Sequence, residues 1–180
     1  AFDEIVARYE VLRSVYRTRE GLPTVEYAAR LDGYFEEHAP DRADPGSPID
    51  LAKAIDAARR EASTPFDLER GPLLRVRVLR LGPDDHIVLI TLHHIVSDGW
   101  SMGVLIEELL TLYSAFASNK PSPLLPLDVQ YGDFAVWQRD YLQGERLERQ
   151  IEYWRTKLGG SSPLIRLPTD HPRPLVQTFN

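Results

Sequence analysis

The chain has 180 residues, and 43% of them are hydrophobic, which is enough to bury a core and fits one domain better than two. Its 21 lysines and arginines against 27 aspartates and glutamates give a net charge of -6, which argues against nucleic acid or an anionic membrane as the main partner. Because cysteine is absent, disulfides, thiolate nucleophiles and thiolate metal sites are excluded.

We expect a cytoplasmic protein, since the sequence shows no secretory signal and no apolar run near the roughly 20 residues of a membrane helix. The chain opens inside an amphipathic run at Ala1 and stops at Asn180 without a change of composition. These ends predict that it is a piece of a longer protein.

The first third of the chain predicts two helices and a hairpin. Apolar residues at helical spacing predict a helix over residues 2–14, packed by one face. Residues 15–19 and 24–28 are expected to pair as a short hairpin across a turn with glycine and proline. Residues 39–48 predict a loop, and the pattern after it predicts a helix over residues 51–64.

The hydrophobic period then changes to two. Residues 74–78 alternate in polarity, as expected for a strand whose wet face carries Arg75 and Arg77. After a Gly-Pro-Asp-Asp turn, residues 87–92 are almost all apolar and many are β-branched. They predict a strand that is buried on both faces and leads directly into two adjacent histidines.

After Gly99 the pattern predicts a long helix with one apolar side. This side is expected to contain Met102, Leu105, Ile106, Leu109, Leu110, Tyr113 and Phe116. Two further helices are predicted over residues 128–142 and 145–158, followed by an extended tail over residues 163–174. Together the elements predict a mixed α/β fold.

The segment most informative about function lies where the second strand becomes the long helix. It contains His93 and His94, followed by Asp98 and Gly99. Because neighbouring strand residues point to opposite faces, at most one of the two histidines can be the working imidazole. Asp98 is expected to orient a ring or anchor the loop, and Gly99 to permit a tight turn.

Three other interpretations of this segment stay open. A single buried histidine is most often an ordinary core residue. A metal site would use histidine and aspartate ligands, but the two histidines diverge and the others are scattered. A serine hydrolase would use Ser97 or Ser101, and residues 99–103 match Gly-x-Ser-x-Gly around Ser101, but they fall within the predicted helix rather than on a sharp turn between a strand and a helix.

The motif His-His-x-x-x-Asp-Gly resembles the active-site signature of the condensation domains of nonribosomal peptide synthetases. It is also similar to that of other coenzyme-A-dependent acyltransferases, including chloramphenicol acetyltransferases. Other segments narrow the resemblance: residues 131–137 resemble the Tyr-x-Asp-Phe-Ala-x-Trp motif of condensation domains, and residues 65–68 and 71–75 resemble their approach to the central strand. Residues 8–14 are similar to Arg-His-Glu-x-Leu-Arg-Thr, with tyrosine and serine in place of histidine and threonine. Epimerisation domains share the double histidine but differ after Asp-Gly, and cyclisation domains replace the histidines with aspartates.

The resemblance implies an α/β two-layer sandwich of the chloramphenicol acetyltransferase type, with a mixed sheet and packed helices. A full family member is more than twice as long and has two lobes with the reaction channel between them. We therefore expect residues 1–180 to be one partial condensation domain that holds most of the N-terminal lobe and lacks the opening segment and the second lobe.

By resemblance, the reaction is attack of the amino group of an acceptor aminoacyl thioester on the carbonyl of a donor acyl or peptidyl thioester. Both substrates arrive on phosphopantetheine arms of carrier domains, and no bound cofactor or metal is expected. The expected partners are the donor and acceptor peptidyl carrier domains, an adjacent adenylation domain and the second lobe. The motif implies a site of His94, His93, Asp98 and Gly99, with His94 removing the proton of the amine or positioning it.

Five more residues are expected to support the site. By resemblance, an arginine pairs with the aspartate of the motif, and we favour Arg13 over Arg8. Tyr131, Asp133 and Trp137 belong to the second matched motif, and the helical spacing of its aromatic residues favours packing over substrate contact.

Two other functions are kept. One is a non-catalytic docking or scaffold domain, which would bind carrier domains without turnover. The other is a stand-alone acyltransferase that uses coenzyme A and a free amine or alcohol.

Overall fold

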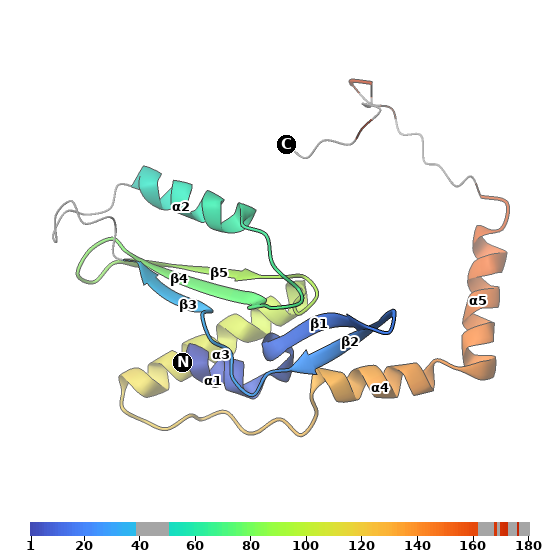
Figure 1. The fold of residues 1–180 in the computed structure, drawn as a ribbon, viewed down its shortest axis with the longest axis horizontal. Coiled ribbons are helices and arrows are strands. Elements are labelled where there is room, and N and C mark those ends of the chain that lie inside the picture. The colour runs from blue at the N-terminus through green and yellow to red at the C-terminus, as the bar shows by residue number, and fades with distance from the viewer. Residues whose placement is uncertain (39–50, 162–167, 169, 173–175, 177–180) are drawn as a thin grey trace. The chain divides into compact units, whose positions relative to one another are not determined.

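The computed structural model describes residues 1–38, 51–161, 168, 170–172 and 176 (Figure 1). Its contacts divide the chain into two compact units, Ala1–Ala135 and Val136–Asn180. Within the described residues, the first unit holds both sheets and every predicted site residue except Trp137. The predicted loop at residues 39–48 and most of the predicted tail at 163–174 lie outside the described residues.

The N-terminal helical segment is broken. Helix α1 (Phe2–Arg8) is followed by a short 3₁₀ helix, η1 (Glu10–Arg13), and Tyr9 between them has an extended backbone. The Gln130 side chain binds the groups that this break frees, donating to the last carbonyl of α1 at 2.9 Å and accepting from the first amide of η1 at 3.2 Å. The prediction of one helix over residues 2–14 is wrong because its pattern gives no sign of this distant partner.

Strands β1 (Ser14–Arg19) and β2 (Leu22–Tyr27) form the predicted antiparallel hairpin. Glu20 and Gly21 connect them, with φ values of 52° and 78°. A two-residue turn with both φ values positive matches the twist of the flanking strands, and glycine adopts such values at little cost. The hairpin is therefore confirmed, with its strands one to two residues from their predicted bounds.

A mixed three-stranded sheet lies at the centre of the first unit. Its order is β3 (Phe35–His38), β4 (Leu74–Arg80) and β5 (His86–Leu92), with β3 parallel and β5 antiparallel to β4. Helix α2 (Leu51–Ser63) lies between β3 and β4 in the chain, as a parallel connection requires. The mixed α/β class and both predicted strands are confirmed.

Strand β5 is more exposed than the sequence predicts. Within the described residues it pairs only with β4, and Val88 on it is 47% exposed. The prediction of a strand buried on both faces is wrong, because a run of apolar residues does not indicate how many neighbours cover it.

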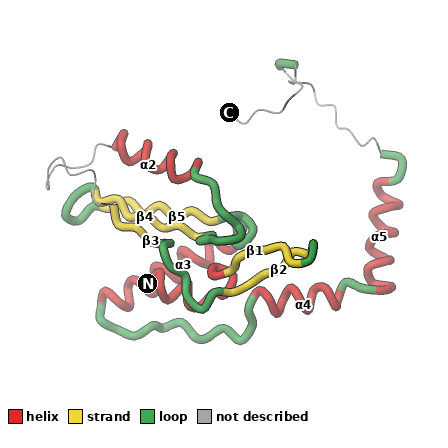
Figure 2. The backbone as a smooth tube through the Cα atoms, viewed as in Figure 1, coloured by secondary structure: helices red, strands yellow, loops and turns green. Residues whose placement is uncertain are grey.

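Helices lie on both faces of this sheet (Figures 1 and 2). Helix α2 covers one face, and α1 with α3 (Gly99–Ala117) covers the other. The main core lies between the sheet and the helices α1 and α3. Its buried side chains include Ile5, Val6, Leu12, Leu73, Leu74, Val76, Leu105 and Leu112. This packing fixes the end of β5 and the start of α3, the two elements that flank the histidines.

The apolar side of α3 differs from the prediction in part. Leu105 is buried as expected, and Leu112, which the predicted stripe omits, is fully buried. Leu110 and Tyr113 are 60% and 66% exposed within the described structure. With so many apolar residues on α3, spacing alone does not show which of two neighbouring stripes meets the core.

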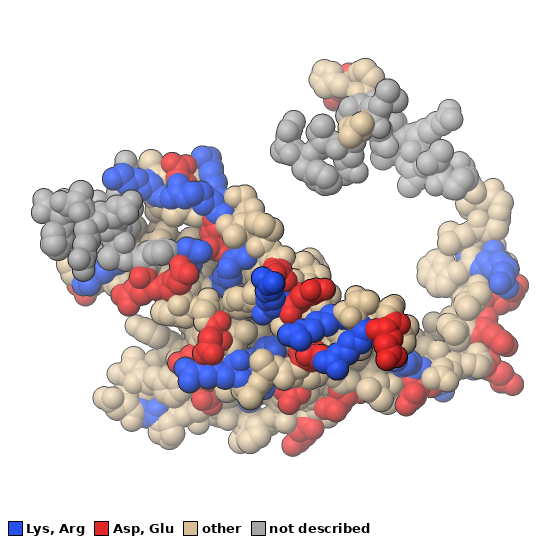
Figure 3. Space-filling model, viewed as in Figure 1, with Lys and Arg blue, Asp and Glu red and all other residues tan. Residues whose placement is uncertain are grey.

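The face that carries Arg75 and Arg77 is not a wet face, and that prediction is wrong. Helix α2 covers it and places Glu61, whose side chain is only 3% exposed, against both guanidinium groups. Elsewhere on the face drawn in Figure 3, acidic and basic side chains are mixed rather than separated by sign. A surface of this kind differs from the basic stripe of a nucleic-acid-binding domain.

Two further helices, α4 (Tyr131–Tyr141) and α5 (Gly144–Leu158), confirm the last helical predictions to within a few residues. At 19 residues α3 is the longest of the described helices, and none of them has a stretch apolar enough to span a bilayer.

Candidate active site

The two histidines follow β5 and point to different surroundings, as strand geometry predicts. His93 continues the strand direction, and its amide donates to the carbonyl of Leu73 at 3.0 Å. Its ring packs edge-on against Phe66, with centroids 5.6 Å apart and planes at 88°. His94 is exposed and lines a pocket of about 370 Å³ that His93 does not line.

His93 shapes the turn that follows it. Its Nδ1 accepts a hydrogen bond from the amide of Ile95 at 3.0 Å. Its carbonyl accepts from the amide of Val96 at 3.0 Å and from the hydroxyl of Ser97 at 3.3 Å. With its ring and its backbone both engaged, His93 has a structural role in the turn.

The pocket of His94 is built from one stretch of chain. Its lining residues come from the end of β5, the turn and the start of α3: Ile90, Thr91, Leu92, His94, Ser97, Asp98, Gly99 and Met102. Among the described residues, no group hydrogen-bonds to the imidazole of His94. An open pocket with an unengaged imidazole on a turn between rigid elements suits proton transfer to or from a bound substrate.

Asp98 is the N-cap of α3. Its Oδ1 accepts from the Ser101 amide at 2.8 Å, and its own amide donates to the Ser101 hydroxyl at 2.7 Å, which completes a capping box. The pKa of Asp98 is lowered, first by the amide and hydroxyl of Ser101 and to a smaller degree by the Trp100 amide and the charge of His94. Asp98 therefore anchors the turn as predicted, and it places a negative charge in the His94 pocket.

The predicted ion pair of Asp98 with Arg13 or Arg8 is wrong. The guanidinium of Arg13 donates to backbone carbonyls, among them Val6 at 3.0 Å, and also Ala28. Arg8 instead forms an ion pair with Glu108 of α3 at 3.1 Å. Both arginines fasten the N-terminal segment, because nearby carbonyls and Glu108 supply the acceptors that a partly buried guanidinium needs.

Gly99 is the first residue of α3 and lines the His94 pocket. We predicted that this glycine permits a tight turn, but the turn does not require a glycine, because the φ of Gly99 lies outside the left-handed region. A Cβ added at Gly99 would meet no atom within 4 Å. The small size of Gly99 leaves room in the pocket rather than relieving the backbone.

The residues of the second matched motif lie in α4 and do not line the His94 pocket. Asp133 accepts from the amide of Gln130 at 2.9 Å and so caps the start of α4. Tyr131 packs against Phe134, with ring centroids 6.0 Å apart. Trp137, in the second unit, stacks on Tyr141 at 4.9 Å. These contacts favour structural roles within each unit.

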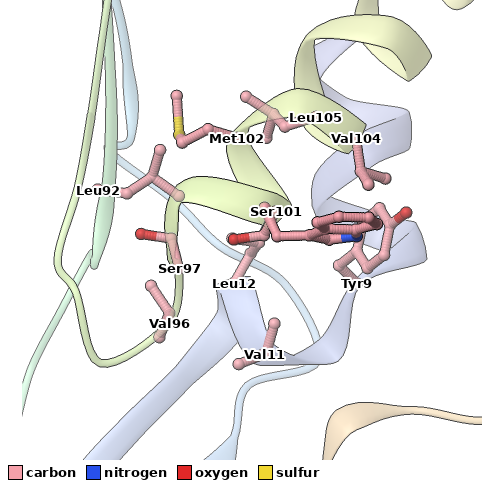
Figure 4. Close-up of a pocket in the computed structure, with 11 residues that line it drawn as sticks. Tyr9, Val11, Leu12, Leu92, Val96, Ser97, Ser101, Met102, Val104 and Leu105 are labelled. Atoms are coloured by element: carbon pink, nitrogen blue, oxygen red, sulfur yellow. The ribbon is translucent and has the colours of Figure 1, made fainter.

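A second pocket, of about 220 Å³, borders the first and is almost wholly apolar (Figure 4). It shares Leu92, Ser97 and Met102 with the His94 pocket. Its other side is formed by residues from the α1–η1 region, among them Tyr9 and Leu12. Sequence reasoning missed this pocket because helical spacing does not separate cavity-lining from core residues.

Comparison with known proteins assigns the family. The sequence model of the condensation domain matches residues 1–180. Malpinin synthetase of Mortierella alpina is 44% identical over 179 residues, which cover 99% of this chain and 2% of that protein. Malpibaldin synthetase of the same organism is 46% identical over 177 residues, which cover 98% of this chain and 3% of that protein.

Among solved structures, the epimerization domain from the third module of tyrocidine synthetase B superposes with a TM-score of 0.75 at 25% identity. The match covers 96% of this chain and 38% of that one. The fold agrees with that of a condensation-type domain, and the two-histidine turn lies where the motif predicted it. The chain belongs to the condensation domain family, and it spans only a small part of the synthetases it matches.

Proposed function

We propose that this chain supplies the catalytic imidazole of a condensation domain that forms an amide bond between two carrier-bound thioesters. The observation that carries the proposal is the exposed imidazole of His94, which has no hydrogen-bond partner among the described residues and lies on a turn between β5 and α3 in a chain of this family. The expected location in the cytoplasm stays a prediction.

In the proposed reaction, the acceptor amine attacks the donor thioester carbonyl, a carbon–nitrogen bond forms, and the carbon–sulfur bond breaks. His94 takes the proton that the amine loses and returns it to the departing thiolate, so that the products are an amide and a free thiol. Imidazole changes charge near neutral pH, which suits both transfers. An α-amino group with a pKa of about 7.7 to 8.0 is partly neutral already, so positioning of the amine by His94 contributes as well.

The remaining residues of the pocket have supporting roles in this proposal. Asp98 holds the turn and places a carboxylate in the pocket of His94. Gly99 leaves space beside the imidazole for the thioester. The phosphopantetheine arms belong to the substrates on donor and acceptor carrier domains. We propose an adenylation domain and the second lobe as further partners in the same synthetase.

A substrate comparison tests this proposal on the complete condensation domain that contains this chain. The domain is given donor and acceptor on carrier domains, or the same acyl groups as coenzyme A thioesters with a free amine, and products are identified by mass spectrometry. We expect amide product from the carrier-bound pair. Product only from coenzyme A thioesters would replace the proposal with a stand-alone acyltransferase, and carrier binding without product would favour the scaffold function.

A further inference from the structure

A buried ion cluster lies on the face of the sheet opposite the main core. The carboxylate of Glu61 on α2 receives Nε of Arg75 at 2.5 Å on one oxygen and forms an ion pair with Arg77 through the other. Burial would raise the pKa of Glu61, but the hydrogen bond and charge of Arg75 and the charge of Arg77 outweigh it and lower the pKa. The site already described does not use this cluster.

Arg75 does more than neutralise Glu61. Its guanidinium also donates to the carbonyls of Thr64 at 2.8 Å and Pro65 at 3.3 Å, directly after α2. The carbon at its centre lies 3.8 Å from the centroid of the Phe66 ring. A planar guanidinium that both stacks on a ring and bonds to the backbone before it leaves that ring little freedom.

The Phe66 ring also meets His93. The two rings make the edge-on contact described above, and Nδ1 of His93 accepts from the amide of Ile95. A continuous set of contacts therefore runs from Arg75 through Phe66 to the turn that carries His94.

We propose that Arg75 and Phe66 are positioning residues for His94: Arg75 fixes the Phe66 ring, and that ring holds His93 against the backbone of the turn. The inference rests on the proposed function, because it concerns the placement of the imidazole that transfers the proton. A displacement of a reacting group by about 1 Å can lower a rate by about 10²-fold. Contacts that hold the turn in place therefore affect the rate of the reaction.

The test uses the complete condensation domain with four variants. Arg75→Met and Phe66→Leu each remove one contact of the set while keeping similar volume. Phe66→Tyr keeps an aromatic ring, and Arg77→Met is the matched control, because it also removes a guanidinium from Glu61, whereas the guanidinium that lies over the Phe66 ring belongs to Arg75. Melting temperature, kcat and KM are measured for each variant.

We expect Arg75→Met and Phe66→Leu to lower kcat by about tenfold with little change in KM, and Phe66→Tyr to stay within about twofold of the parent. Arg77→Met is expected to lower the melting temperature as Arg75→Met does but to keep kcat. Equal losses of kcat in Arg75→Met and Arg77→Met, or no loss in Phe66→Leu, would overturn the inference. If Arg75→Met does not fold, the inference is tested by comparing the kcat of Phe66→Leu with that of Phe66→Tyr.

A second readout does not depend on turnover. In protein with ¹³C-labelled histidine, the ring signal of His93 is identified from its loss in His93→Gln. Because Arg75→Met keeps the Phe66 ring, a shifted or broadened His93 signal there reports that this ring has been released. An unchanged signal would refute the inference even if the domain forms no amide, an outcome that separately refutes the proposed function.

Discussion

The side chains of His94 and Asp98 lie on one turn but are held in different ways. Asp98 is fixed by the capping box with Ser101, whereas the imidazole of His94 has no hydrogen bond within the described part of the chain. Strand periodicity predicted that His93 and His94 diverge, and they do, although both lie beyond the last residue of β5. The partners of Arg13 and Arg8 could not be predicted from the sequence, because a guanidinium pairs with whichever acceptors the fold brings near.

Substitution of Asp98 separates its capping role from its charge. Asparagine caps helices about as well as aspartate, so Asp98→Asn is expected to keep the melting temperature, while Asp98→Ala lowers it. Both variants lose the negative charge beside His94, and we expect both to form amide more slowly. Thermal melts and product rates are measured in parallel. If Asp98→Asn kept the full rate, the cap alone would account for Asp98.

Gly99 provides a second prediction at this scale. Because an added Cβ meets no atom and the backbone needs no left-handed φ, Gly99→Ala is expected to fold with unchanged or slightly higher stability. We expect its KM for carrier-bound substrates to rise, since the methyl group narrows the pocket beside His94. A clear fall in melting temperature would contradict the geometry of the turn, and Gly103→Ala, an open position on the same helix, is the control.

The packing of the elements around the site depends on contacts that the sequence pattern does not predict. Period two predicted β4, and the helical period predicted α2 and α3. Neither pattern showed that α2 covers the arginine face of β4, because the pairing of Glu61 with Arg75 and Arg77 joins separate elements. The burial of Leu112, missed for a similar reason, depends on which stripe of α3 faces α1 and the sheet.

The Glu61 cluster makes stability depend on pH. Because the folded state lowers the pKa of Glu61 below its ordinary 4.5, the stabilisation is complete above that value and is lost as the pH falls through the folded pKa. Glu61→Gln should lower the free energy of unfolding by about 3 to 5 kcal/mol near neutral pH. It should also remove much of the dependence of stability on acid pH. Urea unfolding at several pH values measures both effects. Glu26→Gln, in the exposed ion pairs of the hairpin, should change stability by at most about 1 kcal/mol, and an equal loss there would refute the assignment.

Two leucines of α3 test the packing of that helix. Leu112 is fully buried, and Leu112→Ala is expected to cost about 2 to 5 kcal/mol through lost contacts and the cavity left behind. Leu110 is 60% exposed, so Leu110→Ala should change the free energy of unfolding by at most about 0.5 kcal/mol. Chemical denaturation of both variants measures their free energies of unfolding. A reversed order would show that the other stripe of α3 faces the core.

At the scale of the whole molecule, the motif and the element order were sufficient to predict the family and the mixed α/β class. The matched region covers 38% of the chain of the epimerization domain and a few per cent of the synthetases. The prediction that this chain works with a second lobe stays a prediction. The apolar pocket beside His94 was beyond sequence reasoning, since its walls come from the start of the chain, the end of β5 and the start of α3.

The most direct test of the account is the rate of amide formation by the complete domain with His94→Ala, under single-turnover conditions with both substrates on carrier domains. His86→Ala is the control, because His86 is an exposed histidine at the start of β5, the strand that leads to the turn of His94. We predict a rate at least about 10²-fold lower for His94→Ala and an unchanged rate for His86→Ala, with both variants as stable as the parent. A folded His94→Ala variant that forms amide at the parental rate would contradict the central claim.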